Sequence, residues 1–175
     1  MNDIELHCIR VSYLAYNFAK YLNLAEREQF ALKEAGALHD FGKLYIDRDI
    51  LFKKETLNRN EIFIIKQHPI LGYDVLKNIK IDSNVLRVIL EHHERVDGSG
   101  YPNGLRNDEI FYMSKIISLC DSFDAMINIR CYKDKLTFIE SMLEIENNLN
   151  HQFDEFYGLK FISFLKENKS KLIYM

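Results

Sequence analysis

Helix breakers are scarce in this chain, whose 175 residues include only two prolines and seven glycines. Between them, apolar residues recur every three to four positions, which is the period of an amphipathic helix and not of a strand. The only dense cluster of turn-forming residues covers 97–104, where we expect a loop. The sequence therefore predicts an all-α fold, with helices packed as a bundle.

The predicted helices have local signals that the structure can test. Asn58 should cap a helix, with Glu61 completing a capping box. Pro69 should kink that helix directly after His68, and Ser83 should cap the next one. We expect helices over residues 3–22, 26–39, 58–76, 83–94, 108–126, 135–149 and 154–167, with an irregular segment at 44–56.

Size and composition indicate one soluble domain over residues 1–175, with 47% hydrophobic and 28% charged residues. A net charge of −3 argues against binding to a nucleic-acid polymer or a membrane surface. Three cysteines without CxxC spacing suggest no disulfide framework. Since no signal peptide or membrane-spanning run is present, we expect a cytoplasmic protein.

Five of the six histidines lie at predicted helix positions that could converge on one site, and His151 is the exception. Imidazole is a ligand for borderline divalent metals, and ligation without thiolate favours iron or manganese over a structural zinc site. A lone histidine on a half-buried helix is more often a hydrogen-bonded core residue than a metal ligand. The five are His7, His39, His68, His92 and His93.

Three aspartates accompany these histidines. Asp3 lies one helical turn before His7, which also fits a simple surface pair. Asp40 follows His39, and a carboxylate there could bridge two metals. Asp121 lies among apolar neighbours in a predicted helix, where a carboxylate needs a partner.

The stretch around His39 and Asp40 has two interpretations. It could bring a metal-ligating pair next to Lys43, a cation suited to an anionic substrate. It could instead be a helix end, with Gly42 as the cap and Lys43 complementing the dipole. His92 and His93, if both are helical, would point about 100° apart and suit two neighbouring metals better than one.

In their order and spacing, these motifs resemble those of the HD-GYP phosphodiesterases. The resemblance extends from Asp3 to about Phe164, nearly the whole chain. It rests on His39-Asp40 with Gly42-Lys43, His68-Pro69 with Gly72, His92-His93-Glu94, Asp97-Gly98-Ser99-Gly100-Tyr101-Pro102-Asn103-Gly104-Leu105 and Asp121-Ser122-Phe123-Asp124-Ala125.

The resemblance implies an HD-superfamily helical bundle with a metal site in its core. It implies hydrolysis of the bacterial second messenger cyclic di-GMP to pGpG, GMP or both, by a hydroxide that bridges two divalent metals. His39, Asp40 and Lys43 would be the catalytic residues, with Asp40 bridging the metals. The other ligands would be His7, His39, His68, His92, His93 and Asp121, with Asp3 as a ligand of a third metal.

Substrate contacts also follow from the resemblance. Lys43 would contact the scissile phosphate. Arg130 and Lys133 match phosphate-contacting residues of the family, although a solvated surface pair is the alternative. The loop residues Gly100, Tyr101 and Pro102 would line the substrate cleft.

The chain departs from the family pattern at a few positions. Asp3 replaces a glutamate and is one methylene shorter. Val96 replaces a tryptophan, and prolines are replaced at Asp47, Lys54 and Cys131. These changes affect loop rigidity and the shape of the cleft, while the residues implied to hold two metals are all present.

Other functions stay open at this point. The substrate could be another cyclic dinucleotide such as cyclic GMP-AMP, or a mononucleotide as in other HD-superfamily hydrolases. A third alternative is a signalling module that binds a ligand or partner without catalysis. Because Met1 lies two residues before Asp3, we expect any regulator to be a separate protein chain or to have been removed from this sequence. A regulatory protein and a second copy of the chain, in a homodimer, are the protein partners that stay open.

Overall fold

The structure, a computed structural model, describes residues 3–128 and 136–172. Its described residues form helices and connecting turns, with two isolated β-bridges, Asp97 to Arg106 and Leu149 to Phe153. The all-α prediction is confirmed. Arg130, Cys131 and Lys133 lie outside the described residues, so their predicted roles are not addressed by the structure.

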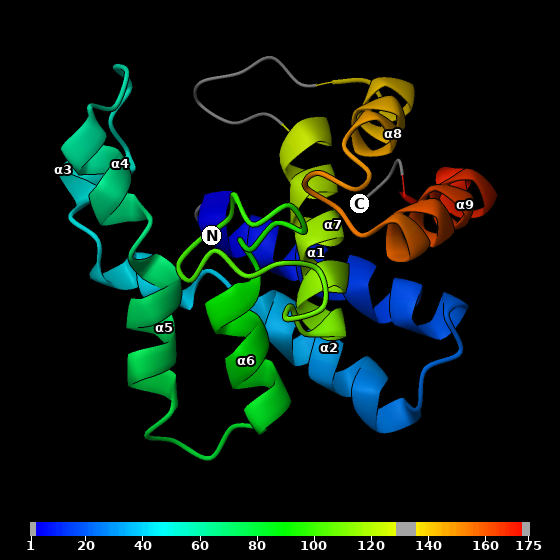
Figure 1. The fold of residues 1–175 in the computed structure, drawn as a ribbon, viewed down its shortest axis with the longest axis horizontal. Helices are drawn as coiled ribbons and strands as arrows, with labels where there is room; N and C mark the ends of the chain where they lie inside the picture. The colour runs from blue at the N-terminus through cyan, green and yellow to red at the C-terminus, as the bar shows by residue number, and fades with distance from the viewer. Residues whose placement is uncertain (1–2, 129–135, 173–175) are drawn as a thin grey trace.

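The helix α7 (Tyr112–Ile127) runs through the middle of the bundle (Figure 1). It contacts α1 (Asp3–Tyr21), α2 (Glu26–Leu38), α6 (Ser83–Glu91), α8 (Phe138–Asn147) and α9 (Glu155–Leu172). Buried residues are spread along its length, among them Met113, Ile116, Ile117, Cys120 and Phe123. A helix with apolar residues on several faces is stable only inside a bundle, which accounts for its central place.

The predicted kink at Pro69 is instead a complete break between α4 (Arg59–Ile65) and α5 (His68–Leu76). Proline has no backbone N–H to continue the hydrogen-bond ladder, but it is well tolerated in the first turn of a helix. The break therefore falls before His68, which becomes the first residue of α5.

Side chains that cap the first turn mark where α4 and α6 begin. Asn58 and Glu61 form the predicted capping box at α4. At α6 the cap is Asp82, whose Oδ1 accepts the N–H of Asn84 at 2.9 Å, and not the predicted Ser83. The start of α7 lies four residues later than predicted, since Phe111, directly before it, has an extended backbone and donates its N–H to Glu91 Oε2 at 2.8 Å.

The segment predicted to be irregular contains two short helical pieces. These are the 3₁₀ helix η1 (Phe41–Tyr45) and α3 (Arg48–Leu51). Gly42 in η1 packs against α5, and a Cβ there would collide with the carbonyl oxygen of His68. Gly42 thus permits a close approach of two backbones and does not serve as the glycine cap of a preceding helix.

Within the described ranges, none of the helices combines the length and apolar character needed to span a membrane.

Candidate metal centre

Three of the predicted histidine ligands lie at helix ends and share one hydrogen-bond pattern. His39 follows α2, His68 begins α5, and His92 follows α6. In each, Nδ1 lies 2.8 Å from the carbonyl oxygen three residues earlier, which belongs to Gly36, Ile65 or Ile89. Because a carbonyl oxygen only accepts, Nδ1 carries the proton and Nε2 is left with a lone pair.

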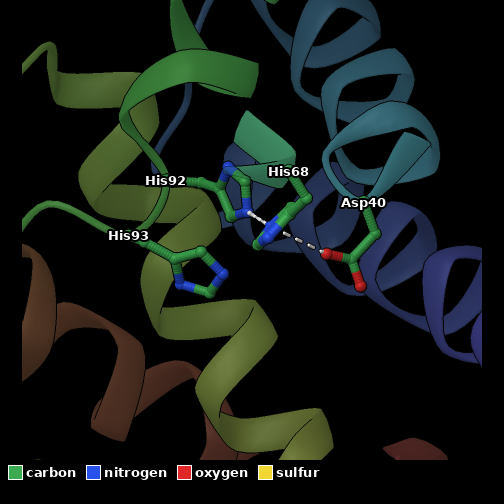
Figure 2. A group of neighbouring side chains, drawn as sticks. All are labelled: Asp40, His68, His92 and His93. Atoms are coloured by element: carbon green, nitrogen blue, oxygen red, sulfur yellow. Dashed lines mark hydrogen bonds and ion pairs between the residues drawn. The ribbon is translucent and has the colours of Figure 1, made fainter. Parts of the chain in front are cut away.

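These lone pairs face one another inside the protein. The Nε2 atoms of His68 and His92 are 3.2 Å apart (Figure 2), and neither can donate a hydrogen bond when both Nδ1 atoms are protonated. His39 Nε2 and Asp40 Oδ1 are also buried without a hydrogen-bond partner. Buried acceptors that converge in this way require a cation. The residues present therefore fit a divalent metal.

Asp40 stands between two groups of candidate ligands. Its Oδ1 lies 3.3 Å from His68 Nε2, whereas its Oδ2 lies 3.6 Å from His39 Nε2 and 3.9 Å from His7 Nε2. Within each group the ligand atoms all lie within 4.8 Å of one another. One group is Asp40, His68, His92 and His93, drawn in Figure 2, and the other is His7, His39 and Asp121.

His92 and His93 belong to the same group, with ring centroids 4.1 Å apart. The expectation that they would point toward two different metals assumed that both are helical. In the structure His92 is the C-cap of α6, with backbone angles still in the helical region, and the ligand atoms of both histidines belong to the group that contains Asp40 and His68.

Burial keeps these imidazoles in the neutral form that binds metals. Desolvation lowers the pKa of His68 to about 4 and that of His93 to about 3, and it also lowers the pKa values of His39 and His92. Burial acts to raise the pKa of the Asp40 carboxyl, but the Lys43 ammonium, 2.6 Å from its Oδ2, holds that pKa well below its usual range. The site thus combines neutral imidazoles with an ionised carboxylate.

His7 is held by carboxylates on both ring nitrogens. Its Nε2 lies 3.0 Å from Asp121 Oδ1, and its Nδ1 lies 2.7 Å from Asp124 Oδ2. Burial opposes a charge on His7, yet these two aspartates raise its pKa to about 9. A metal bound at Nε2 would therefore have to displace a proton.

Asp124 and Arg10 are site residues that sequence reasoning missed. The Arg10 guanidinium donates to Asp124 from Nε at 2.6 Å and from Nη2 at 2.9 Å, while Asp124 orients His7. A carboxylate that fixes a ligating histidine is common around protein metal sites. The available signal was the position of Asp124 one helical turn after Asp121, on the same face.

Asp3 and Cys8 belong to neither of these two groups of candidate ligands. Asp3 is exposed in the first turn of α1 and is in neither group, so its role at a third metal stays a prediction. Cys8, for which no role was predicted, is buried and lies close to His39 and Asp40. Burial raises the pKa of its thiol to about 12, which makes it a poor ligand at neutral pH.

The predicted cleft loop is fastened to the metal centre by hydrogen bonds. The buried carboxylate of Glu94 accepts the N–H groups of Asn103 at 2.7 Å and Leu105 at 2.9 Å. Tyr101 donates its N–H to the His93 carbonyl at 3.2 Å, and its ring stacks on the His93 ring with centroids 4.8 Å apart. The loop therefore places Tyr101 against a candidate ligand.

Comparison with known proteins identifies the family. The model of a family described as HD domain matches residues 5–156. The chain belongs to the HD domain family, and its relatives include cyclic dinucleotide phosphodiesterases. This confirms the resemblance to the HD-GYP group that the motifs indicated.

Two curated relatives are equally similar to the chain. It is 36% identical over 148 residues to the cyclic di-GMP phosphodiesterase response regulator RpfG of Xanthomonas campestris, covering 83% of this chain and 39% of that protein. It is 36% identical over 146 residues to the 3'3'-cGAMP-specific phosphodiesterase 1 of Vibrio cholerae, covering 83% of this chain and 33% of that protein. The chain spans less than half the length of these relatives.

The fold also matches solved structures. One is Bd1817 of Bdellovibrio bacteriovorus, described as a HDG"Y"P protein, with a TM-score of 0.75 and 21% sequence identity. The match covers 93% of this chain and 52% of that one. At this identity the match shows that the two share a fold.

Proposed function

We propose that this chain is a metal-dependent phosphodiesterase that hydrolyses a cyclic dinucleotide. The observation that carries the proposal is the position of Asp40 between two groups of candidate ligands: its Oδ1 lies 3.3 Å from His68 Nε2, and its Oδ2 lies 3.6 Å from His39 Nε2 and 3.9 Å from His7 Nε2. When bound, two divalent ions activate water at neutral pH and neutralise charge on a phosphoryl group. That chemistry suits the cleavage of a phosphodiester.

The roles proposed for the residues follow from the two groups. Asp40 would be shared by the two metals, with His68, His92 and His93 to hold one and His7, His39 and Asp121 to hold the other. The nitrogen and oxygen donors favour iron or manganese, since the nearby thiol is protonated. Asp124 and Arg10 position His7 and do not touch the substrate.

Lys43 has two tasks in this proposal. Its ammonium lies 2.6 Å from Asp40 Oδ2, which keeps the bridging carboxylate ionised and oriented. It also brings a positive charge to the place where an anionic phosphate would lie, and such a charge stabilises the transition state more than the ground state. Arg130 and Lys133 remain predicted contacts for the substrate phosphates.

Cyclic di-GMP is the substrate that we propose first, and cyclic GMP-AMP is the alternative. Relatives with each activity are equally identical to the chain, so sequence identity does not choose between them. The Gly100-Tyr101-Pro102 loop beside His93 supports a cyclic dinucleotide over a mononucleotide. A binding module without catalysis is disfavoured, because every ligand of the two proposed metal sites is retained.

Chromatography of nucleotide products tests the proposal. The protein would be reconstituted anaerobically with iron or manganese and incubated in turn with cyclic di-GMP and cyclic GMP-AMP. We expect linear dinucleotide or mononucleotide products that disappear on chelation and in Asp40→Asn. Asp74→Asn, at an exposed aspartate on α5, is the matched control and should keep full activity. No turnover of either compound by folded, metal-loaded protein would reject the proposal.

A further inference from the structure

A cavity of about 570 Å³ opens beside the metal centre, between the start of α1 and the segment formed by η1 and α3. Asp40 and Lys43 form part of its wall. The rest is mainly apolar and includes Ile4, Ile9, Phe41, Leu44, Leu51 and Phe52. Tyr101 and its loop are not among the lining residues, so the cavity is distinct from the predicted cleft loop.

The apolar side chains around this cavity are unusually open to solvent. Ile9 is 54% exposed, Leu44 is 71% exposed and Phe52 is 45% exposed. Apolar side chains gathered at a cavity mouth commonly mark a binding site. The cavity volume is within the range of about 300–1,000 Å³ that small-molecule sites have.

We propose that this cavity binds a guanine base of the substrate, on the side of Asp40 that faces η1 and α3. The inference rests on the proposed function and adds a base-recognition site to it. A base is joined to its phosphate through one sugar, so a base in this cavity would leave the attached phosphodiester at Asp40 and Lys43. The aromatic rings of Phe41 and Phe52 provide apolar surfaces for stacking.

Arg48 is the reason for choosing guanine. Its guanidinium borders the cavity, lies 5.8 Å from the centre of the Phe52 ring, and makes no ion pair with any described residue. A guanidinium can donate two parallel hydrogen bonds to O6 and N7 of guanine. Adenine carries an amino group, which is a donor, in place of O6. It can therefore accept only the hydrogen bond at N7. Both candidate substrates contain guanine, so the assignment holds for either.

Variants of the apolar wall separate base binding from metal chemistry. Phe52→Ala removes a stacking surface, and Ile9→Trp fills the cavity from an exposed position on α1. Activity would be measured on cyclic di-GMP, on cyclic GMP-AMP and on bis(p-nitrophenyl) phosphate, a phosphodiester without a base. We expect kcat/KM for the cyclic dinucleotides to fall about tenfold or more, the loss of roughly one base stack, with hydrolysis of bis(p-nitrophenyl) phosphate unchanged.

Phe156→Ala is the matched control, since Phe156 lies on α9 away from the cavity and is 60% exposed. It should change neither activity. Equal losses on both kinds of substrate would show that the wall variants disturb the metal centre, and unchanged activity on both would show that the cavity is not used. Either result overturns the inference.

A binding measurement keeps this test separate from the proposed function. Equilibrium dialysis would measure the affinities of GMP and AMP for metal-loaded protein. The measurement would be made whether or not the protein hydrolyses a cyclic dinucleotide. We expect GMP to bind about tenfold more tightly than AMP, Phe52→Ala to weaken both, and Arg48→Ala to remove the preference. Equal binding of GMP and AMP to the unaltered protein, or GMP binding unaffected by Phe52→Ala, would reject the guanine site.

Discussion

The Lys43 ammonium contacts Asp40 Oδ2 at 2.6 Å, while the other oxygen of this carboxylate faces His68. One lysine thus stabilises the charge of the group that we propose bridges the metals, and it does so at the edge of the proposed substrate site. Metal binding and phosphate binding therefore meet at a single residue pair.

Lys43→Met should lower kcat about 100-fold or more, because it removes a fixed positive charge beside the reacting phosphate. Lys43→Arg should retain more activity than Lys43→Met, because arginine keeps the positive charge although its guanidinium differs in shape from an ammonium. Steady-state kinetics on the cyclic dinucleotide that is turned over would give kcat and KM separately. A change in KM alone would contradict a role in the chemical step.

Asp124→Asn should weaken metal binding by about 10- to 100-fold, because His7 would lose the carboxylate that orients it. Arg10 would also lose its ionic partner, so a stability measurement must accompany the titration. Metal titration should show that one of two ions is weakened and the other is nearly unchanged. Two unchanged affinities would mean that Asp124 supports the fold and does not position a ligand.

Glu94→Gln should destabilise the protein by about 1–3 kcal/mol, because an amide replaces one of the two buried oxygens that accept loop N–H groups. The loop carrying Tyr101 should loosen, and kcat/KM should fall with it. Urea denaturation measures the first effect and kinetics the second. The exposed Glu155 on α9 offers Glu155→Gln as a control, which should change neither quantity.

The protein stripped of metal should be most stable near pH 6.5. His68, with a pKa of about 4, and His93, with a pKa of about 3, stay neutral while the unfolded chain takes up protons below about pH 6.5. Stability therefore falls as the pH drops from 6.5 toward 4, by an amount on the order of a few kcal/mol.

His7 acts in the opposite direction because its folded pKa, about 9, lies above the unfolded value. The contribution of His7 to the stability of the folded protein is fully present below about pH 6.5 and is lost as the pH rises through about 9. Urea denaturation in the presence of a chelator, between pH 4.5 and 9, would measure both the acid and the alkaline loss of stability. A stability that rises steadily to pH 9 would contradict this account of His7, and His7→Gln should remove the alkaline loss.

The sequence predicted the helical fold from the period of its apolar residues, which is a local pattern. The residues that gather at the site were predicted by the resemblance to the HD-GYP family, whereas Asp3, also predicted from it, is in neither group. The period of the apolar residues locates α1 and α2 within one residue of their observed ends. The break before Pro69 and the late start of α7 depend on which backbone groups find other partners, and periodicity does not carry that information.

Contacts between distant parts of the chain were beyond sequence reasoning. Arg10 and Asp124 are 114 positions apart, and only the packing of α1 against α7 brings them together. Gly42 was open to interpretation as a helix cap, whereas its function in the fold is the close approach of η1 to α5. The cavity beside Asp40 likewise arises from the arrangement of α1, η1 and α3.

Metal content, measured by mass spectrometry after anaerobic loading and removal of unbound metal, tests most directly whether Asp40 is shared by two metal ions. We predict two ions per chain in the unaltered protein, two in Asp74→Asn, and at most one in Asp40→Asn, which keeps the size of the side chain but loses its bridging charge. Two tightly held ions in folded Asp40→Asn, or none in the unaltered protein, would contradict the account.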